Sequence, residues 1–461
     1  MKIIETITKY IEQSRYETLP REVIEKAKII LLDTLGVGLS GAKTKPGKIM
    51  IEVIKNLGGK KESTLIGDGS RVNCVQAGYV NSYLVDVMDF EETYVGLCHP
   101  NASVVPAALA VGESVKASGK EVIHSIVIGN EIGTRIGLAI RPSKERTETG
   151  GSAYTWHCFG SVAAASKLLH LNQIQMMNAF GFTGSSTSLP TSITKWERPL
   201  HWVKNNFQRQ TEAGILGALM ARNGFTGPIQ ILDSDLGFWR MAGSDRCDYD
   251  QMKKGLGEEY EILKISLKPY PACRWIHGTL DAVFELLKEN SVKYEEIDQI
   301  KVISVSELKK WFTDYHPKSL VDAEFSVPYT VAMLILGIKP GLGWFKEKTL
   351  EDPKVLSLAQ KVRVESTPEE DEVFYRSTVQ MASSAVEIIM KDGTSFHKRI
   401  EVEKEPLRGS PENSIDAIGK FKQCAREAGM KKDQAEKMIA LIDRLDQLDS
   451  ISALTKLLKI A

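Results

Sequence analysis

Apolar residues at helical spacing dominate the first 265 residues of the chain. Residues 23–39 place an apolar side chain every three or four positions, as the amphipathic N-terminus does. Four later segments are apolar almost all round, which is typical of helices buried in a large bundle: 120–138, 160–171, 173–182 and 213–223. The run of three alanines at 163–165 predicts close helix packing. The pattern therefore predicts a large all-helical domain over residues 1–265.

The pattern changes after residue 265. Residues 294–307 alternate between apolar and polar positions, and residues 361–365 are a second short strand candidate. Residues 385–390 and 396–402 flank Asp392-Gly393, which predicts a β-hairpin with a tight primed turn. The helices expected to pack on this sheet are 279–289 and 327–336. Residues 266–404 are therefore predicted to form a smaller α+β domain.

The last part of the chain returns to helical patterning. Residues 414–428 and 433–458 are amphipathic, with leucines on plausible core faces. We expect residues 405–461 to pack back on the first helical domain. The predicted fold class is mainly α: a large all-helical domain with an inserted smaller α+β domain.

The charge balance argues against polyanionic partners. Lysine plus arginine and aspartate plus glutamate both number 59, so the formal net charge is zero. No global field favours nucleic acid or an anionic membrane surface, and no apolar run approaches the roughly 18 residues of a membrane span. Six scattered cysteines without a CxxC pair are typical of reduced thiols. We therefore expect a cytoplasmic protein without nucleic-acid or membrane partners.

The stretch from Asp86 to Asn101 carries the densest candidate chemistry. If the preceding apolar segment is a helix, Asp89 and Thr93 are four residues apart and share a face. The chain then turns at His99, and Asn101 is placed to cap the next helix. A carboxylate, a hydroxyl and an imidazole that converge where two helices meet could transfer protons. The alternative is a helix cap beside a surface loop.

Two more segments could complete such a site. His157 stands at the predicted start of the alanine-rich helix, where the helix dipole would favour a neutral imidazole; the alternative is a capping or core-lining histidine. Residues 195–209 hold four cations, one histidine and two tryptophans before the helix near residue 213. A carboxylate-binding pocket fits this segment better than nucleic-acid binding, and a solvated basic loop is the alternative.

The predicted domain junction, residues 267–277, is a third candidate. Two prolines keep Lys268 extended, and Arg274 and His277 then lie three apart at a helix start. Small-molecule sites favour such junctions, although a rigid connector with solvated cations explains the segment equally well. A polar loop that contains Tyr315 is a weaker candidate.

Metal and nucleotide motifs are poorly represented. The pairs Cys98-His99 and His157-Cys158 offer potential ligands, but adjacent residues point in different directions, and no HExxH or CxxC motif is present. Residues 36–41 formally match GxGxxG, yet they end a helical pattern instead of following a strand, so we interpret them as a helix stop. We predict no metal and no cofactor.

With these clusters assembled, the chain resembles the MmgE/PrpD family over nearly its whole length. The matching segments occur in the family's order: LLDTLGVGLSG, NSYLVDVMDFEETYVGLCHPNASVVPAALA, HCFGSVAAASKLLHL, EAGILGALMARNGFTGP, LKPYPACRWIHGTLDA and DAEFSVPYTVA. The resemblance implies a homodimer in which the active site lies between a large helical domain and a smaller α+β domain. It also implies a site without a metal or an iron–sulfur cluster.

The resemblance also implies roles for individual residues. The residues that match the family's polar active-site positions are Asp89, Thr93, His99 and His157. Lys268 and His277 match its domain-junction motif, and Tyr315 matches a substrate-loop tyrosine.

One departure concerns the family's lysine before the helix near residue 213. Lys204 fits this position by distance, although Gln208 stands where a glycine is usual. Arg198 matches some members locally but lies several residues too early. We therefore expect Lys204, and not Arg198, to face Asp89 and the two histidines.

Members of this family move a proton at a carbon next to a carboxylate, which implies a function for this chain. The first hypothesis is a cofactor-independent lyase that dehydrates or decarboxylates a di- or tricarboxylate such as a 2-methylcitrate- or aconitate-like acid. The alternative is an isomerase or epimerase that uses the same enolate-like intermediate. A non-catalytic metabolite-binding protein is a third hypothesis.

Overall fold

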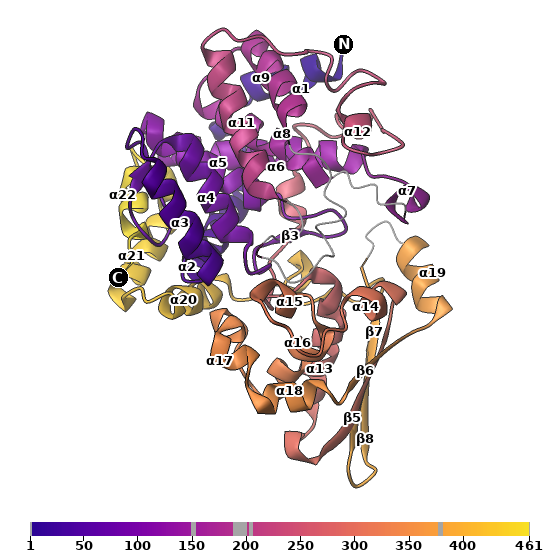
Figure 1. Cartoon of the computed structure of the whole chain (residues 1–461). Helices are drawn as coiled ribbons and strands as arrows, with labels where there is room; N and C mark the ends of the chain where they lie inside the picture. The colour runs from indigo at the N-terminus through magenta and orange to yellow at the C-terminus, as the bar shows by residue number, and fades with distance from the viewer. Residues whose placement is uncertain (1, 149–153, 188–200, 202–205, 377–380, 461) are drawn as a thin grey trace.

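The chain folds into a helical part and a smaller part built around a four-stranded sheet (Figure 1). The computed structural model describes residues 2–148, 154–187, 201, 206–376 and 381–460. The predicted fold class, mainly α with a smaller α+β part, is confirmed.

Buried helices form the core of the larger part. Its helices before the sheet are α1 (Ile3–Gln13), α2 (Arg21–Gly41), α3 (Lys45–Leu57), α4 (Cys74–Asp86), α5 (Asn101–Val115), α6 (Gly119–Ala139), α7 (Lys144–Glu148), α8 (His157–Leu168), α9 (Gln173–Ser186), α11 (Phe207–Arg222) and α12 (Phe238–Met241). Short strand pairs join β1 (Ser63–Thr64) to β2 (Arg71–Val72), and β3 (Thr93–Tyr94) to β4 (Ile265–Ser266). Within the described residues, no helix is both long enough and apolar enough to cross a membrane.

Glycines allow α6 and α8 to lie almost in backbone contact. A Cβ atom on Gly133 of α6 would lie only 3.0 Å from the Cα of Gly160 in α8, and one on Gly137 would lie 2.6 Å from the Trp156 ring. The alanines at 163–165, predicted to pack closely, are completely buried. This close packing positions the start of α8, and with it His157.

The smaller part is a mixed sheet with helices against it. The strand order is β6-β5-β7-β8, in which β5 and β6 are parallel and the other neighbours are antiparallel. The strands are β5 (Ile297–Ser304), β6 (Val362–Ser366), β7 (Ser384–Met390) and β8 (Ser395–Ile400). The helices are α13 (His277–Glu289), α14 (Ser306–Trp311), α15 (Leu320–Glu324), α16 (Val327–Ile335), α17 (Glu347–Leu350), α18 (Pro353–Ala359) and α19 (Pro368–Arg376).

The β7–β8 hairpin is present, but the prediction of a primed turn was wrong. A primed type I turn needs two residues with positive φ, and among residues 391–394 only Gly393 has one, at 86°. The N–H of Gly393 donates to the Met390 carbonyl, and the N–H of Met390 donates to the Thr394 carbonyl. The loop is therefore longer than two residues and uses the glycine for its left-handed position.

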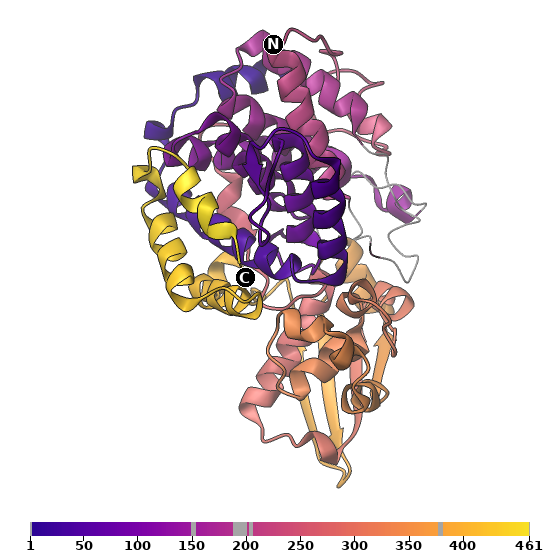
Figure 2. The same cartoon turned by 60° about the vertical axis from the view of Figure 1, so that its left-hand side comes forward.

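The C-terminal helices return to the helical part, beside α2 (Figure 2). They are α20 (Ala417–Glu427), α21 (Lys432–Asp443) and α22 (Ser452–Thr455), so the predicted helix 433–458 is broken into pieces. A Cβ atom on Gly36 would lie 3.1 Å from the Phe421 ring, and Ser40 donates to the Cys424 carbonyl (3.2 Å). The glycines of the GxGxxG match, at 36, 38 and 41, lie within α2, and Gly41 is the last residue of this helix.

The domain limits 1–265, 266–404 and 405–461 stay a prediction.

Candidate active site

A sharp turn after α4 presents the acidic residues of the candidate site. Helix α4 ends at Asp86, so the prediction that Asp89 and Thr93 share a helix face was wrong. Asp89 has φ 43°, a strained conformation for a residue other than glycine, and its N–H donates to the Asp86 carbonyl (2.9 Å). Thr93 lies in β3 opposite Ser266 of β4, and its hydroxyl donates to the Cys98 carbonyl (3.2 Å). Tertiary pairing with β4 therefore replaces helix continuation.

Asn101 is the first residue of α5 and not its cap, so that prediction was also wrong. No side-chain hydrogen bond caps this helix. The Asn101 side chain instead pairs with the Asn130 side chain through two hydrogen bonds (3.0 and 2.8 Å). The carboxyl group of Glu92 accepts the Asn101 N–H at 2.5 Å. Burial raises the pKa of Glu92 to about 8, so this acid is mostly protonated at neutral pH.

His99 lies between the carboxyl groups of Asp89 and Glu91. Its Nε2 is 3.5 Å from Asp89 Oδ1, and its Nδ1 is 3.3 Å from Glu91 Oε1 and 2.7 Å from the Glu92 carbonyl oxygen. Lys268 forms an ion pair with Asp89 Oδ1 and donates to the Asp89 carbonyl (2.7 Å). The Lys268 and Asp89 side chains are completely buried. The structure thus unites Asp89, His99 and Lys268 in one water-poor group, in which electrostatic interactions are strong.

The same group is the one place in the described residues where three metal-ligand side chains meet. Ligand atoms of Asp89, Glu91 and His99 lie within 4.8 Å of one another and could hold a cation. The Lys268 ammonium already supplies positive charge at Asp89. This set contains His99 but not Cys98, and it contains neither His157 nor Cys158, so neither of the adjacent pairs considered from the sequence forms it. Burial also raises the pKa of the Cys158 thiol, which disfavours the thiolate that binds metals.

His157 begins α8, as predicted, and two aromatic rings contact its imidazole. The Trp156 ring stacks on it with centroids 3.6 Å apart, and the Phe207 ring meets it edge to face at 4.5 Å. Phe207 also contacts the His99 ring, at 6.0 Å. The two histidines therefore share one phenyl ring. Sequence reasoning missed Phe207, since a phenylalanine at a helix start has no chemical signature.

The basic segment that was predicted to supply a lysine to the site lies only partly within the described residues. Lys204 and Arg198 both lie outside the described residues. His201 is described: it is exposed, and its carbonyl oxygen accepts the Tyr83 hydroxyl (2.7 Å). Helix α11 begins at Phe207, several residues earlier than predicted. Lys204 therefore precedes this helix by three residues in sequence, and its role stays a prediction.

The junction motif supplies a buried arginine with open hydrogen-bond donors. Arg274 is only 4% exposed; its Nη1 lies 2.9 Å from His277 Nδ1 and donates to the Arg408 carbonyl (3.1 Å). Its Nε and Nη2 have no hydrogen-bond partner among the described residues. Burial lowers the pKa of Arg274 to about 10, so it still carries its charge at neutral pH. A buried guanidinium with one free edge is suited to bind a carboxylate.

His277 holds that arginine in place. Burial and the Arg274 charge keep the pKa of His277 well below its usual value. The neutral ring therefore donates through Nε2 to the Ala272 carbonyl (3.1 Å) and accepts the Arg274 N–H at Nδ1. This arrangement makes His277 an orienting group for Arg274.

Tyr315 forms a hydrogen bond to the sheet of the smaller part. Its hydroxyl donates to the carbonyl oxygen of Val362, the first residue of β6 (3.1 Å). The Asp89–His99–Lys268 group does not use this hydroxyl, and the predicted substrate contact of Tyr315 stays a prediction.

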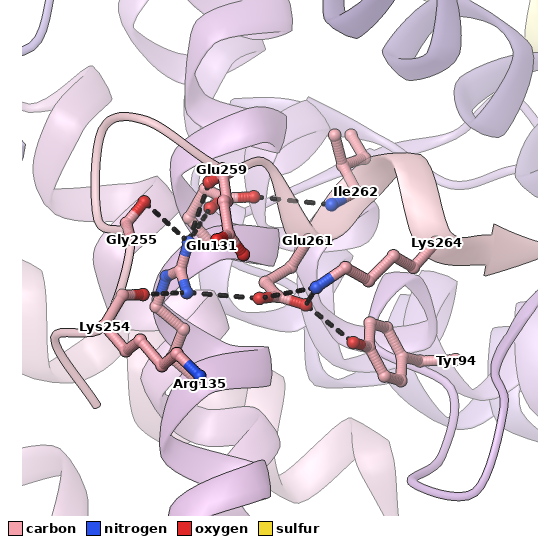
Figure 3. A network of polar contacts seen from close by, with 9 residues as sticks. All are labelled: Tyr94, Glu131, Arg135, Lys254, Gly255, Glu259, Glu261, Ile262 and Lys264. Carbon is pink, nitrogen blue, oxygen red and sulfur yellow. Dashed lines mark hydrogen bonds and ion pairs between the residues drawn. The ribbon is translucent and has the colours of Figure 1, made fainter. Parts of the chain in front are cut away.

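A second buried network anchors β3 through the side chain of Tyr94 (Figure 3). Tyr94 donates to Glu261 Oε2 (2.6 Å), and Arg135 of α6 donates to Glu261 Oε1 (3.1 Å) and Glu131 Oε2 (3.0 Å). Burial raises the pKa of Glu131 to about 7. Sequence reasoning missed this network, although an acid and an arginine four residues apart in an apolar helix were a usable signal.

The fold and this site define a class of protein, a two-part mainly helical chain with a buried acid–imidazole–lysine group. The chain matches the MmgE/PrpD N-terminal domain over residues 5–248 and the MmgE/PrpD C-terminal domain over residues 270–447. It therefore belongs to the MmgE/PrpD family, as its motifs predicted.

Curated relatives span most of the chain. The cis-aconitate decarboxylase of Mus musculus is 26% identical over 453 residues, which cover 95% of this chain and 89% of the relative. The cis-aconitate decarboxylase of Aspergillus terreus (strain NIH 2624 / FGSC A1156) is 26% identical over 422 residues, 85% and 84%. The mitochondrial 2-methylcitrate dehydratase of Yarrowia lipolytica is 21% identical over 413 residues, 85% and 78%.

Proposed function

We propose that this protein is a lyase that acts on a tricarboxylate or dicarboxylate similar to cis-aconitate or 2-methylcitrate, and that it needs no cofactor. The observation that carries the proposal is the buried group of Asp89, His99 and Lys268, together with the open edge of Arg274. Relatives named as cis-aconitate decarboxylases and a 2-methylcitrate dehydratase support the substrate class.

Arg274 is the proposed anchor for a substrate carboxylate. The Lys268 ammonium is already paired with Asp89, whereas Nε and Nη2 of Arg274 leave two parallel N–H groups without partners among the described residues. Two such donors match the two oxygens of one carboxylate. A second carboxylate needs another cation, and Lys204 is the proposed candidate because it precedes Phe207, the neighbour of both histidines.

The proposed chemistry is proton transfer beside a carboxylate. In decarboxylation, the bond between the carboxylate and its carbon breaks, carbon dioxide leaves, and the electron pair enters an enolate-like system; that carbon then takes a proton from an imidazole. In dehydration, a base removes the proton next to a carboxylate, and an acid protonates the departing hydroxyl. Asp89 and Glu91 flank His99 and can hold its ring in position for either step, with Thr93 nearby in β3.

An epimerase or isomerase is the second candidate, and one observation favours it. Epimerisation needs two proton-transfer groups on opposite faces of one carbon, and the rings of His99 and His157 both contact Phe207. Decarboxylation remains the first reaction to test because two relatives whose matches cover 95% and 96% of this chain carry that name.

The test is turnover of a panel of polycarboxylates by the purified protein in heavy water, followed by NMR. The lyase proposal expects loss of carbon dioxide or water, with deuterium at the protonated carbon. Deuterium exchange or inversion without loss of mass would establish the epimerase instead. Saturable binding without exchange or product would mean a non-catalytic metabolite-binding protein.

We also propose that the chain is a homodimer in the cytoplasm. The family resemblance supports the dimer, and six scattered cysteines without a CxxC pair are consistent with a reducing compartment. Light scattering coupled to gel filtration tests the dimer, which should have twice the mass of the chain.

A further inference from the structure

The C-terminal helix α20 reaches the acidic turn of the candidate site through one lysine. Lys420 is 9% exposed, and its ammonium lies 2.7 Å from Asp33 Oδ1 of α2. The same ammonium donates to the Phe90 carbonyl oxygen (2.7 Å) and lies 4.1 Å from the centre of the Phe90 ring. Residues more than 300 positions apart in sequence thus meet at Phe90, the residue that follows Asp89.

Two buried lysines hold two consecutive carbonyl groups of this turn. Lys268 donates to the Asp89 carbonyl, and Lys420 donates to the Phe90 carbonyl; both bonds are 2.7 Å long. Along the chain the two lysines flank the sheet of the smaller part: Lys268 precedes β5, and Lys420, in α20, follows β8. Because Asp89 has a strained backbone with φ 43°, its conformation persists only if its surroundings hold it.

Because its charge is balanced by a neighbouring carboxylate, Lys420 acts on the turn mainly as a hydrogen-bond donor and contributes little electrostatic potential there. Asp33 neutralises it, and burial raises the pKa of that carboxyl while Lys420 opposes the increase. The carboxylate of Asp89 is paired with Lys268, not with Lys420. Loss of Lys420 would therefore release the Phe90 carbonyl without removing the main cation at Asp89.

We propose that Lys420 is a positioning residue for catalysis: through the Phe90 carbonyl it fixes the turn so that the Asp89 carboxylate faces His99 and Lys268. This inference rests on the proposed function for its kinetic consequence, but its structural consequence can be measured without a substrate.

Three variants separate the bond to Phe90 from the ion pair. Lys420→Met combined with Asp33→Leu removes both buried charges together, so that no unpaired charge is left in the core. Asp33→Asn alone keeps the lysine and its bond to Phe90. Lys422→Met is the matched control, because Lys422 lies one helical half-turn away on α20 and pairs with Glu436 at the surface (2.9 Å).

The kinetic experiment compares kcat and KM on whichever panel substrate the wild-type protein converts. We expect the double variant to lower kcat by about 10–100-fold with KM within about twofold, since small misplacements of reacting groups cost rates of this order. Asp33→Asn should retain most of kcat, and Lys422→Met should be unchanged. A folded double variant with wild-type kcat would overturn the proposal, as would an equal loss in Asp33→Asn.

Hydrogen exchange measured by mass spectrometry provides the substrate-free readout. Peptides that cover residues 86–100 should exchange at least about tenfold faster in the double variant than in wild type or Lys422→Met, because the anchored turn opens more often. Unchanged exchange in these peptides would refute the positioning role. If the wild type converts no acid in the panel, the proposed function fails, and the exchange result alone decides the role of Lys420.

Discussion

Replacement of Arg274 by methionine gives the most direct test of substrate binding. The side chain is 4% exposed and uses Nη1 on His277 and the Arg408 carbonyl, so Nε and Nη2 remain for a ligand. Each charge-assisted hydrogen bond contributes about 1.5–3 kcal/mol, and a two-bond fork therefore about 3–6 kcal/mol. At about 1.4 kcal/mol per tenfold change, kcat/KM should decrease by about 10²–10⁴-fold.

The fold should survive this substitution. Methionine is apolar and flexible enough to fill the space, and it leaves the His277 acceptor and the Arg408 carbonyl oxygen without this donor, at a cost of about 1–3 kcal/mol for a buried acceptor. Arg274→Lys keeps a charge but loses the planar fork, so its kcat/KM should lie between those of wild type and Arg274→Met. Arg399→Met is the matched control, since Arg399 of β8 is exposed and pairs with Glu370 of α19, away from the candidate site.

Steady-state kinetics on the converted acid, with thermal unfolding as the check on folding, provides the assay. A substrate analogue that lacks one carboxylate provides a second comparison. The ratio of kcat/KM for the full substrate to kcat/KM for the analogue should be large for wild type and much smaller for Arg274→Met. A change in kcat/KM below about threefold in a folded Arg274→Met protein would refute the reasoning, because two buried charge-assisted bonds cannot contribute so little.

Three further predictions concern the acid–imidazole group. His99→Ala and His157→Ala should each lower kcat by about 10²–10⁴-fold with the fold intact. Near-normal rates in both variants would show that other residues transfer the proton. Activity should survive exhaustive chelation with EDTA, although Asp89, Glu91 and His99 could hold a cation; loss of all turnover that zinc or iron restores would show that the cofactor-free proposal is wrong. The third concerns pH. Because burial raises the pKa of Glu92 to about 8, the folded state keeps a proton that the unfolded chain releases near pH 4.5, so Glu92 contributes stability at low pH that is lost as pH increases to about 8. The expected slope approaches about 1.4 kcal/mol per pH unit within this window. Glu92→Gln should flatten the pH dependence of unfolding between about pH 4.5 and 8, whereas an unchanged profile would mean that this carboxyl does not hold its proton.

Periodicity alone predicted most elements of this fold. Helices α2, α6, α8, α9 and α13 and strands β5–β8 occur where apolar spacing predicted them, because burial of an apolar face is a local property of each segment. The family was also visible in the sequence, since its motifs are long and ordered. His157 at the start of α8 is an example in which local pattern and final position agree.

Local pattern failed where long-range contacts determine the backbone. Asp89 and Thr93 have helical spacing, but the pairing of β3 with β4 and the ammoniums of Lys268 and Lys420 hold the turn in a conformation that spacing cannot indicate. The Asn101 side chain could have capped its own helix, yet Asn130 from α6 offered two hydrogen bonds in the core.

The sequence by itself therefore determined the helices, the sheet, the family and the residue types available for chemistry. Only the tertiary structure decided that Asp89 is neutralised by Lys268, that His277 orients Arg274, and that Phe207 joins two histidines. The physical reason is that pairing between buried polar groups depends on atoms a few ångströms apart that can be hundreds of residues apart along the chain, where periodicity carries no information.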